Sequence, residues 1–141
     1  MMVNHMDDYD DYGEIILDSK EPFAKKILEF FTYKDSLDIF ELAEDPISVN
    51  DISARSGHTK ATIYRRIPDL LDTSMLIAVG REKDQKNHGK ISSWLYEKSF
   101  YAAGVRCGPT TDYCHCQATV IEILPKRRFY GQILRTIRSY R

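Results

Sequence analysis

The feature that most constrains this chain is a pair of short helical patterns joined by one glycine. Ser48, followed three residues later by Asp51, is a capping-box-like start, and Gly57 can adopt the left-handed conformation that ends a helix sharply. Thr59 can cap the next helix. The apolar residues of that second helix recur at three- and four-residue spacing, at Ile63, Ile67, Leu70 and Leu71. Two short helices joined by such a turn, the second basic on its other face, predict a helix-turn-helix.

The residues that follow predict a β-hairpin. Residues 76–79 have strand composition, residues 80–90 (GREKDQKNHGK) are polar and basic, and residues 91–100 return to β-type residues. A helix-turn-helix followed directly by a hairpin predicts a winged helix, with the hairpin as its wing. Further along, residues 118–124 predict a strand that Pro125 ends, and residues 129–140 predict a terminal amphipathic helix. The expected fold class is therefore α+β, a winged helix-turn-helix with an additional C-terminal strand and helix.

Length and charge suggest how the chain is organised. A chain of 141 residues corresponds to one compact domain with an extra element or two. Residues 1–21 hold seven acidic residues and one lysine, whereas the rest of the chain is net basic. We expect residues 1–19 to be an acidic flexible arm, residues 20–104 to be the winged helix-turn-helix, and residues 105–141 to be a cysteine-containing strand and helix for sensing or dimerisation.

Residues 47–97, and above all the stretch SARSGHTKATIYRRI, resemble the winged helix-turn-helix of prokaryotic, archaeal-looking regulators of the ArsR, MarR and TrmB-like groups. The resemblance covers roughly residues 36–100 and implies a dimeric transcriptional regulator whose third helix enters the major groove. Pro68 lies inside that helix and predicts a bend, or an end and restart. Members usually have glycine where Met75 stands, so the exit must be made differently here. For His58 we favour a partly buried, hydrogen-bonded side chain over a ligand role.

The candidate DNA contacts lie on the second helix of the motif and on the hairpin. If the apolar stripe faces the core, helical geometry places the basic residues of that helix toward solvent, and its first turn can bind a phosphate or a base edge. Arg65 and Arg66 carry planar guanidinium groups suited to guanine or phosphate. The basic side chains of the wing would position the protein on the DNA phosphate backbone. The candidate DNA-binding residues are Thr59, Lys60, Thr62, Tyr64, Arg65, Arg66, Arg81, Lys83, Lys86, His88 and Lys90.

A cluster of three cysteines and one histidine lies within the sequence CGPTTDYCHC. If the last two cysteines lie on a strand, their thiolates point to one face, where a metal or metalloid such as zinc, copper(I) or arsenite would find ligands. A redox switch and plain structural burial are the two other interpretations, and all three stay open. The candidate ligands are Cys107, Cys114, Cys116 and His115.

The remaining expectations concern function class and partners. No glycine-rich phosphate loop occurs, and Cys114 and His115 would point to opposite faces of a strand, so we do not expect an enzyme. The chain has no apolar run long enough for a membrane span, and the odd cysteine number favours a reducing cytoplasm. The expected partners are double-stranded DNA and a second copy of the chain. The alternative is a winged helix that contacts other proteins in a regulatory assembly.

Overall fold

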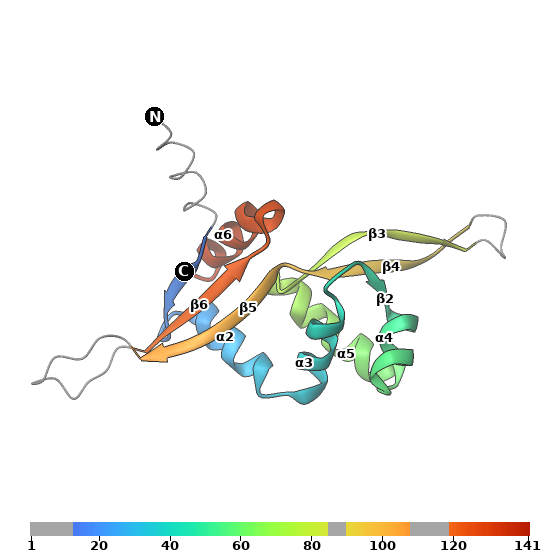
Figure 1. Ribbon diagram of the computed structural model, residues 1–141, viewed down its shortest axis with the longest axis horizontal. Helices are drawn as coiled ribbons and strands as arrows, with labels where there is room; N and C mark the ends of the chain where they lie inside the picture. The colour runs from blue at the N-terminus through green and yellow to red at the C-terminus, as the bar shows by residue number, and fades with distance from the viewer. Residues whose placement is uncertain (1–12, 85–89, 108–118) are drawn as a thin grey trace, which may run out of the picture. The chain divides into compact units, whose positions relative to one another are not determined.

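A computed structural model describes the backbone of residues 13–84, 90–107 and 119–141, and the side chains of residues 13–82, 93–105 and 120–141 (Figure 1). The fold is α+β, as expected, with two three-stranded antiparallel sheets. The chain divides into two compact units. Unit 1 combines residues from Met1–Leu28 and Phe100–Arg141, and unit 2 is Glu29–Ser99. No helix in the described ranges is both long and apolar enough to cross a bilayer.

Unit 2 contains three helices and one of the two sheets. Its elements in chain order are α3 (Lys34–Leu42), β2 (Ile47–Ser48), α4 (Val49–Ser56), α5 (Lys60–Asp72), β3 (Leu76–Asp84) and β4 (Lys90–Lys98). The strand order is β2-β4-β3, and β3 and β4 form a long hairpin (Figure 1). Ile39, Ile52 and Ile63 are fully buried, one from each helix, so the three apolar stripes form one core.

The local signals around Gly57 act as predicted. The Ser48 hydroxyl accepts a hydrogen bond from the Asp51 N–H at 3.3 Å, and the Thr59 hydroxyl accepts one from the Thr62 N–H at 3.2 Å. Gly57 has φ +83° and ends α4. These caps satisfy backbone N–H groups that a helix start leaves without partners, so α4 and α5 begin where the sequence predicts.

Pro68 lies inside α5, which runs without interruption from Lys60 to Asp72. The expected end and restart is therefore wrong. A proline has no N–H to donate to the carbonyl four residues earlier, here that of Tyr64. Both Pro68 and Tyr64 are exposed, so water can solvate this carbonyl and the helix tolerates the missing bond.

The exit from α5 uses Ser74 in place of a glycine. Ser74 has φ +57°, the left-handed region. Its N–H donates to the Leu71 carbonyl, and the Met75 N–H donates to the Leu70 carbonyl, each at 3.0 Å. This is a Schellman-type cap, in which the left-handed position is normally glycine. The expected departure from the glycine exit is thus confirmed: the left-handed residue that ends α5 is Ser74, one residue before Met75.

Unit 1 contains the other sheet and the terminal helix. Its elements are β1 (Ile15–Asp18), the start of α2 (Pro22–Phe31), β5 (Phe100–Cys107), β6 (Thr119–Pro125), the 3-10 helix η2 (Arg127–Phe129) and α6 (Tyr130–Ser139). The strand order is β1-β6-β5. Ile121 and Ile123 alternate along β6 and are buried, while Leu124 is exposed, as the predicted alternation requires.

Part of the expected N-terminal arm is a strand. Ile15–Asp18 pair with β6, from Ile15 opposite Ile123 to Asp18 opposite Val120. Ile15 and Leu17 are buried, so this short alternating pattern finds a partner far along the chain. The prediction of a flexible arm up to residue 19 is wrong for these residues, and residues 1–12 lie outside the described ranges.

The apolar stripe of the terminal helix packs within unit 1. Phe129, Ile133 and Ile137 are buried, and the Tyr140 ring meets the Phe23 ring edge-on with centroids 5.6 Å apart. The stripe is therefore part of the unit's own core, and these side chains are not free to pack on another copy of the chain.

Candidate nucleic-acid interface

The exposed face of α5 carries the cationic and aromatic residues that the sequence singled out. Lys60, Tyr64 and Arg65 are exposed, and Thr59 caps the helix at their N-terminal side. The Arg65 side chain is 66% exposed, and its Nη2 lies 4.0 Å from the Asp35 carboxylate, the outer limit of an ion pair. Arg65 is therefore free to meet an anion, and Lys60 lies at the positive end of the helix dipole.

Arg66 has a different environment from its neighbour. Its Nε lies 3.1 Å and 3.0 Å from the two carboxylate oxygens of Asp35, and its guanidinium lies 4.4 Å from the Tyr33 ring centroid. The side chain is only 22% exposed. The expectation that Arg66 points to solvent is wrong, because an acid and an aromatic ring on the neighbouring α3 and its N-cap hold it inside unit 2. Arg66 stabilises the packing of α5 on α3.

The β3–β4 hairpin places Arg81 and Trp94 opposite each other. Arg81 pairs with Trp94 in the strand register, and the guanidinium carbon lies 5.0 Å from the indole ring. Arg81 is exposed, and Trp94 is 46% exposed. Of the other predicted hairpin contacts, Lys83 and Lys90 lie on β3 and β4 but outside the described side chains, and Lys86 and His88 lie outside the described residues.

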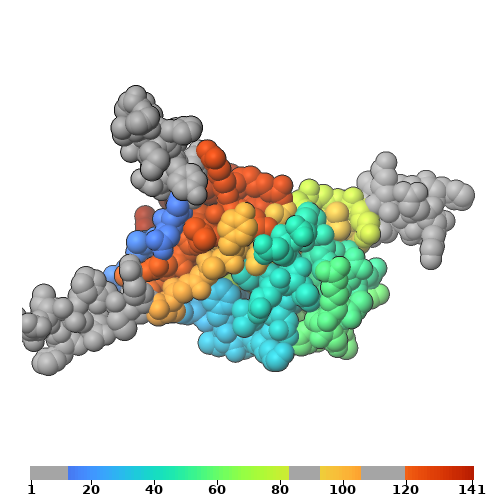
Figure 2. Space-filling view, in the orientation of Figure 1, coloured from blue at the N-terminus to red at the C-terminus, as the bar shows by residue number. Residues whose placement is uncertain are grey.

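Sequence reasoning missed Trp94. Its signal was present, because Trp94 and Tyr96 occupy alternate positions of one strand and therefore share a face. Tyr96 is buried, and its pKa is raised by this burial and, to a smaller extent, by the neighbouring phenol of Tyr64. α5 and β3 also contact each other, so this helix lies close to the hairpin. Figure 2 shows the helices of unit 2, in blue-green and green, as one continuous surface beside the yellow-green hairpin.

His58 follows the turn and is structural, as favoured from the sequence. Its Nε2 lies 2.8 Å from the Asp38 carboxylate, which also accepts a hydrogen bond from the Lys34 ammonium at 3.1 Å. The hydrogen bond with His58, and then that with Lys34, lower the pKa of Asp38 below its usual range. A shallow hollow of about 310 Å³ beside this pair is lined by Lys34, Asp38, Glu41, Leu42, Arg55 and Ser56.

The predicted metal ligands lie almost entirely outside the described structure. Cys107 ends β5, where its backbone pairs with Thr119, and its side chain is not among those described. Cys114, His115 and Cys116 lie outside the described residues. Within the described ranges, no group of three or more His, Cys, Asp or Glu side chains is arranged to hold a metal ion. The metal prediction stays a prediction.

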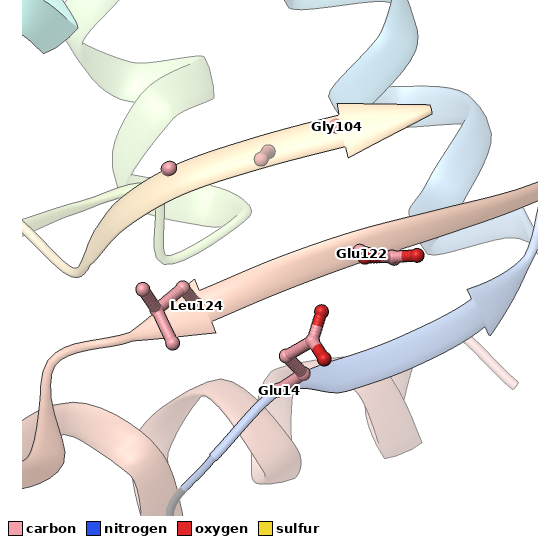
Figure 3. A pocket seen from close by; sticks show the side chains of 6 residues that line it. Glu14, Gly104, Glu122 and Leu124 are labelled. Carbon is pink, nitrogen blue, oxygen red and sulfur yellow. The ribbon is translucent and has the colours of Figure 1, made fainter. Parts of the chain in front are cut away.

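A second hollow, of about 380 Å³, lies on the sheet of unit 1 (Figure 3). Its floor is small and apolar at Ala102 and Gly104, and Leu124 bounds it. Glu14 and Glu122 supply two carboxylates, which makes this hollow acidic, whereas the exposed face of α5 is basic. Two carboxylates make this hollow a poor site for nucleic acid. The candidate interface on unit 2 rests on the exposed cations of α5 and the hairpin, although unit 1 also exposes arginines on its terminal helix, among them Arg135 and Arg138.

The described geometry thus gathers Thr59, Lys60, Tyr64 and Arg65 on α5 and Arg81 on the hairpin, and removes Arg66 from the set of exposed cations. Comparison with known proteins adds no relative: no protein-family model, no curated protein and no solved structure matches the chain.

Proposed function

We propose that unit 2 is a winged helix-turn-helix that binds double-stranded DNA, and that the protein is a transcriptional regulator. The observation that carries the proposal is the exposed face of α5, where a capped N-terminus, Lys60 and the 66% exposed Arg65 follow a tight glycine turn. In a DNA-binding helix-turn-helix, the second helix enters the major groove with its N-terminal residues at the base edges. Arg81 on the β3–β4 hairpin, the proposed wing, would contact the phosphate backbone.

The decisive experiment is fluorescence anisotropy with a mixed-sequence duplex at about 50 and about 200 mM salt. The native chain should lose affinity steeply between the two conditions, because each phosphate contact releases counterions. Lys60→Ala combined with Arg65→Ala should weaken binding and lower the salt slope by up to about two, at roughly 0.9 per phosphate contact. Lys25→Ala is the charge control, since Lys25 is exposed on α2 in unit 1.

Flat, weak binding that neither variant changes would contradict the DNA proposal. It would favour the second candidate, a winged helix that contacts other proteins. That alternative is favoured by Asp35, which neutralises Arg66, and by the exposed rings of Tyr33 and Tyr64. Arg66→Ala is a poor probe of either function, because it also removes the packing of α5 on α3.

We also propose that the regulator is a homodimer, joined through the outer edge of β5. The two edges of the unit 1 sheet differ: β1 is four residues long and carries Asp18, whereas residues 100–105 of β5 carry no charge. Charged residues protect a sheet edge from pairing, and β5 lacks them there. Antiparallel pairing of two copies centred on Ala103 would set Tyr101 opposite Val105, both of which are exposed.

Sedimentation velocity tests the dimer. Val105→Lys should shift the native dimer toward monomer, because two lysines would then flank the paired edge, while Ile16→Lys on β1 should not. A native chain that sediments as a monomer at all concentrations, or a dimer that Val105→Lys leaves intact, would contradict pairing through β5. The cysteine cluster remains a proposed effector site for zinc, copper(I) or a metalloid. The double variant Cys114→Ser with Cys116→Ser would inactivate this site without changing DNA affinity.

A further inference from the structure

Unit 2 exposes aromatic side chains on α5 and on the hairpin. Trp94 is the single tryptophan of the chain and is 46% exposed on β4. Tyr64 on α5 is 56% exposed, and Tyr96 is buried two residues after Trp94 on the same face of the strand. The contacts proposed for α5 use polar and charged side chains, and they leave the exposed indole of Trp94 on the hairpin without a role.

The surroundings of Trp94 indicate what can cover it. The Arg81 guanidinium lies 5.0 Å from the indole, and the exposed neighbours on the hairpin include Glu82, whose carboxylate accepts a hydrogen bond from Ser93 at 3.3 Å. An apolar helix of a partner would need an aliphatic surface around the ring, and these neighbours are charged or polar. A nucleobase instead needs one flat aromatic face and a nearby cation for its phosphate. Because the Arg81 guanidinium lies over one face of the indole, the base would stack on the other face, with its phosphate toward Arg81 and away from the Glu82 carboxylate.

We propose that Trp94, with Arg81, is a stacking platform for an unpaired nucleobase. A base within a continuous duplex already stacks on its neighbours and has no face to offer, so the platform favours DNA in which single-stranded bases adjoin a duplex. The inference rests on the proposed DNA binding by α5 and extends it: α5 holds the duplex, and the middle of the hairpin, at Arg81 and Trp94, holds the first unpaired nucleobase.

Intrinsic fluorescence tests the platform directly, because Trp94 is the only tryptophan. Two probes are compared at one salt concentration: a fully paired duplex and the same duplex with a single-stranded thymidine tail. The tailed DNA should quench Trp94 and bind more tightly, whereas the paired duplex should change the emission little. Equal affinity for both probes in the native chain would overturn the proposal.

Variants separate stacking from general DNA contact. Trp94→Ala should weaken binding of the tailed probe by about 5- to 100-fold, the usual loss when one stacking ring is removed, and leave duplex binding within about twofold. Trp94→Phe should retain part of the preference. Arg81→Ala should weaken both probes, because Arg81 also contacts the duplex backbone in the proposed function, and should weaken the tailed probe more. Tyr101→Ala is the matched control, since Tyr101 is a 51% exposed aromatic residue on β5 of unit 1.

The possible results also separate this inference from the proposed function. Equal weakening of both probes by Trp94→Ala, in a variant with native circular dichroism, would overturn the platform and leave duplex binding standing. Tight binding of the tailed probe and none of the duplex would support the platform and contradict the double-stranded DNA proposal. Binding of neither probe would overturn both.

Discussion

The two sheets are built alike and differ in what they expose. Each has three antiparallel strands and buries isoleucines on its inner face. The sheet of unit 2 exposes Trp94 and Arg81, whereas that of unit 1 exposes Ile16, Val105 and, at the edge of the acidic hollow, Leu124. The first surface places the cation Arg81 beside an aromatic ring, and the second is mainly apolar with two carboxylates in its hollow. The difference teaches that two sheets with the same number of strands and similar cores can expose surfaces of different chemistry.

The largest expected effects come from substitutions in the two cores. Ile63→Ala removes a fully buried side chain from unit 2, and Ile123→Ala removes one from unit 1. Each should lower the free energy of unfolding by about 2–4 kcal/mol, the usual cost of such a cavity. Urea denaturation followed by circular dichroism measures the loss.

The affinity for DNA should distinguish Ile63→Ala from Ile123→Ala. Under conditions where both remain folded, Ile63→Ala should weaken binding, because it loosens α5, and Ile123→Ala should leave it unchanged. The reverse result would place the interface in unit 1 and contradict the assignment.

A smaller gain is expected at the exit of α5. Ser74 has φ +57°, a backbone conformation that is unfavourable for a residue with a Cβ atom but not for glycine. Ser74→Gly should therefore raise the free energy of unfolding by about 0.5–1 kcal/mol, which is measured as a higher thermal midpoint. The Ser74 carbonyl also accepts a hydrogen bond from the Ser99 hydroxyl, which glycine retains. Ser74→Ala is the control and should give no gain; an equal gain from both would contradict the backbone explanation.

The smallest effect concerns pH. The pKa of Asp38 is lowered in the folded unit, mainly by its hydrogen bond with His58, so the unfolded chain takes up this proton at higher pH than the native one. The resulting stability is present above the ordinary carboxyl pKa of 3.8 and is lost as the pH falls below it. Solvent screening limits the contribution to about 0.2–0.5 kcal/mol.

Asp38→Asn isolates this contribution. Between pH 5 and pH 3, conditions that bracket the ordinary carboxyl pKa, the native chain should lose more stability than the variant in urea titrations. Asp51→Asn is the comparison, because no other described carboxyl shares the contact with His58. Parallel curves for the native chain and Asp38→Asn would contradict the role of this pair.

Local signals were readable from the sequence, and long-range pairings were not. Ser48, Gly57 and Thr59 act within a few residues, so the ends of α4 and α5 were predicted. The prediction of one strand over residues 91–100 was wrong, since β4 ends at Lys98 and β5 begins at Phe100. No local sequence pattern indicates that β4 ends in one sheet and that β5, which follows directly, belongs to the other.

The candidate site shows the same division. Exposure of Lys60 and Arg65 followed from helical periodicity. Capture of Arg66 did not, because its partner Asp35 lies 31 residues earlier and only the packing of α5 on α3 brings them together. The domain boundaries at residues 20 and 104 stay predictions, as does the role of the cysteine cluster.

The pairing of β1 with β6 has a consequence during synthesis. Ile15 lies opposite Ile123, so β1 leaves the ribosome about 100 residues before its partner, a delay on the order of 5–20 s at ordinary elongation rates. All of unit 2 emerges in that interval and can fold first. Until β6 arrives, Ile15 and Leu17 have no sheet to join, so β1 is an exposed apolar segment in the nascent chain.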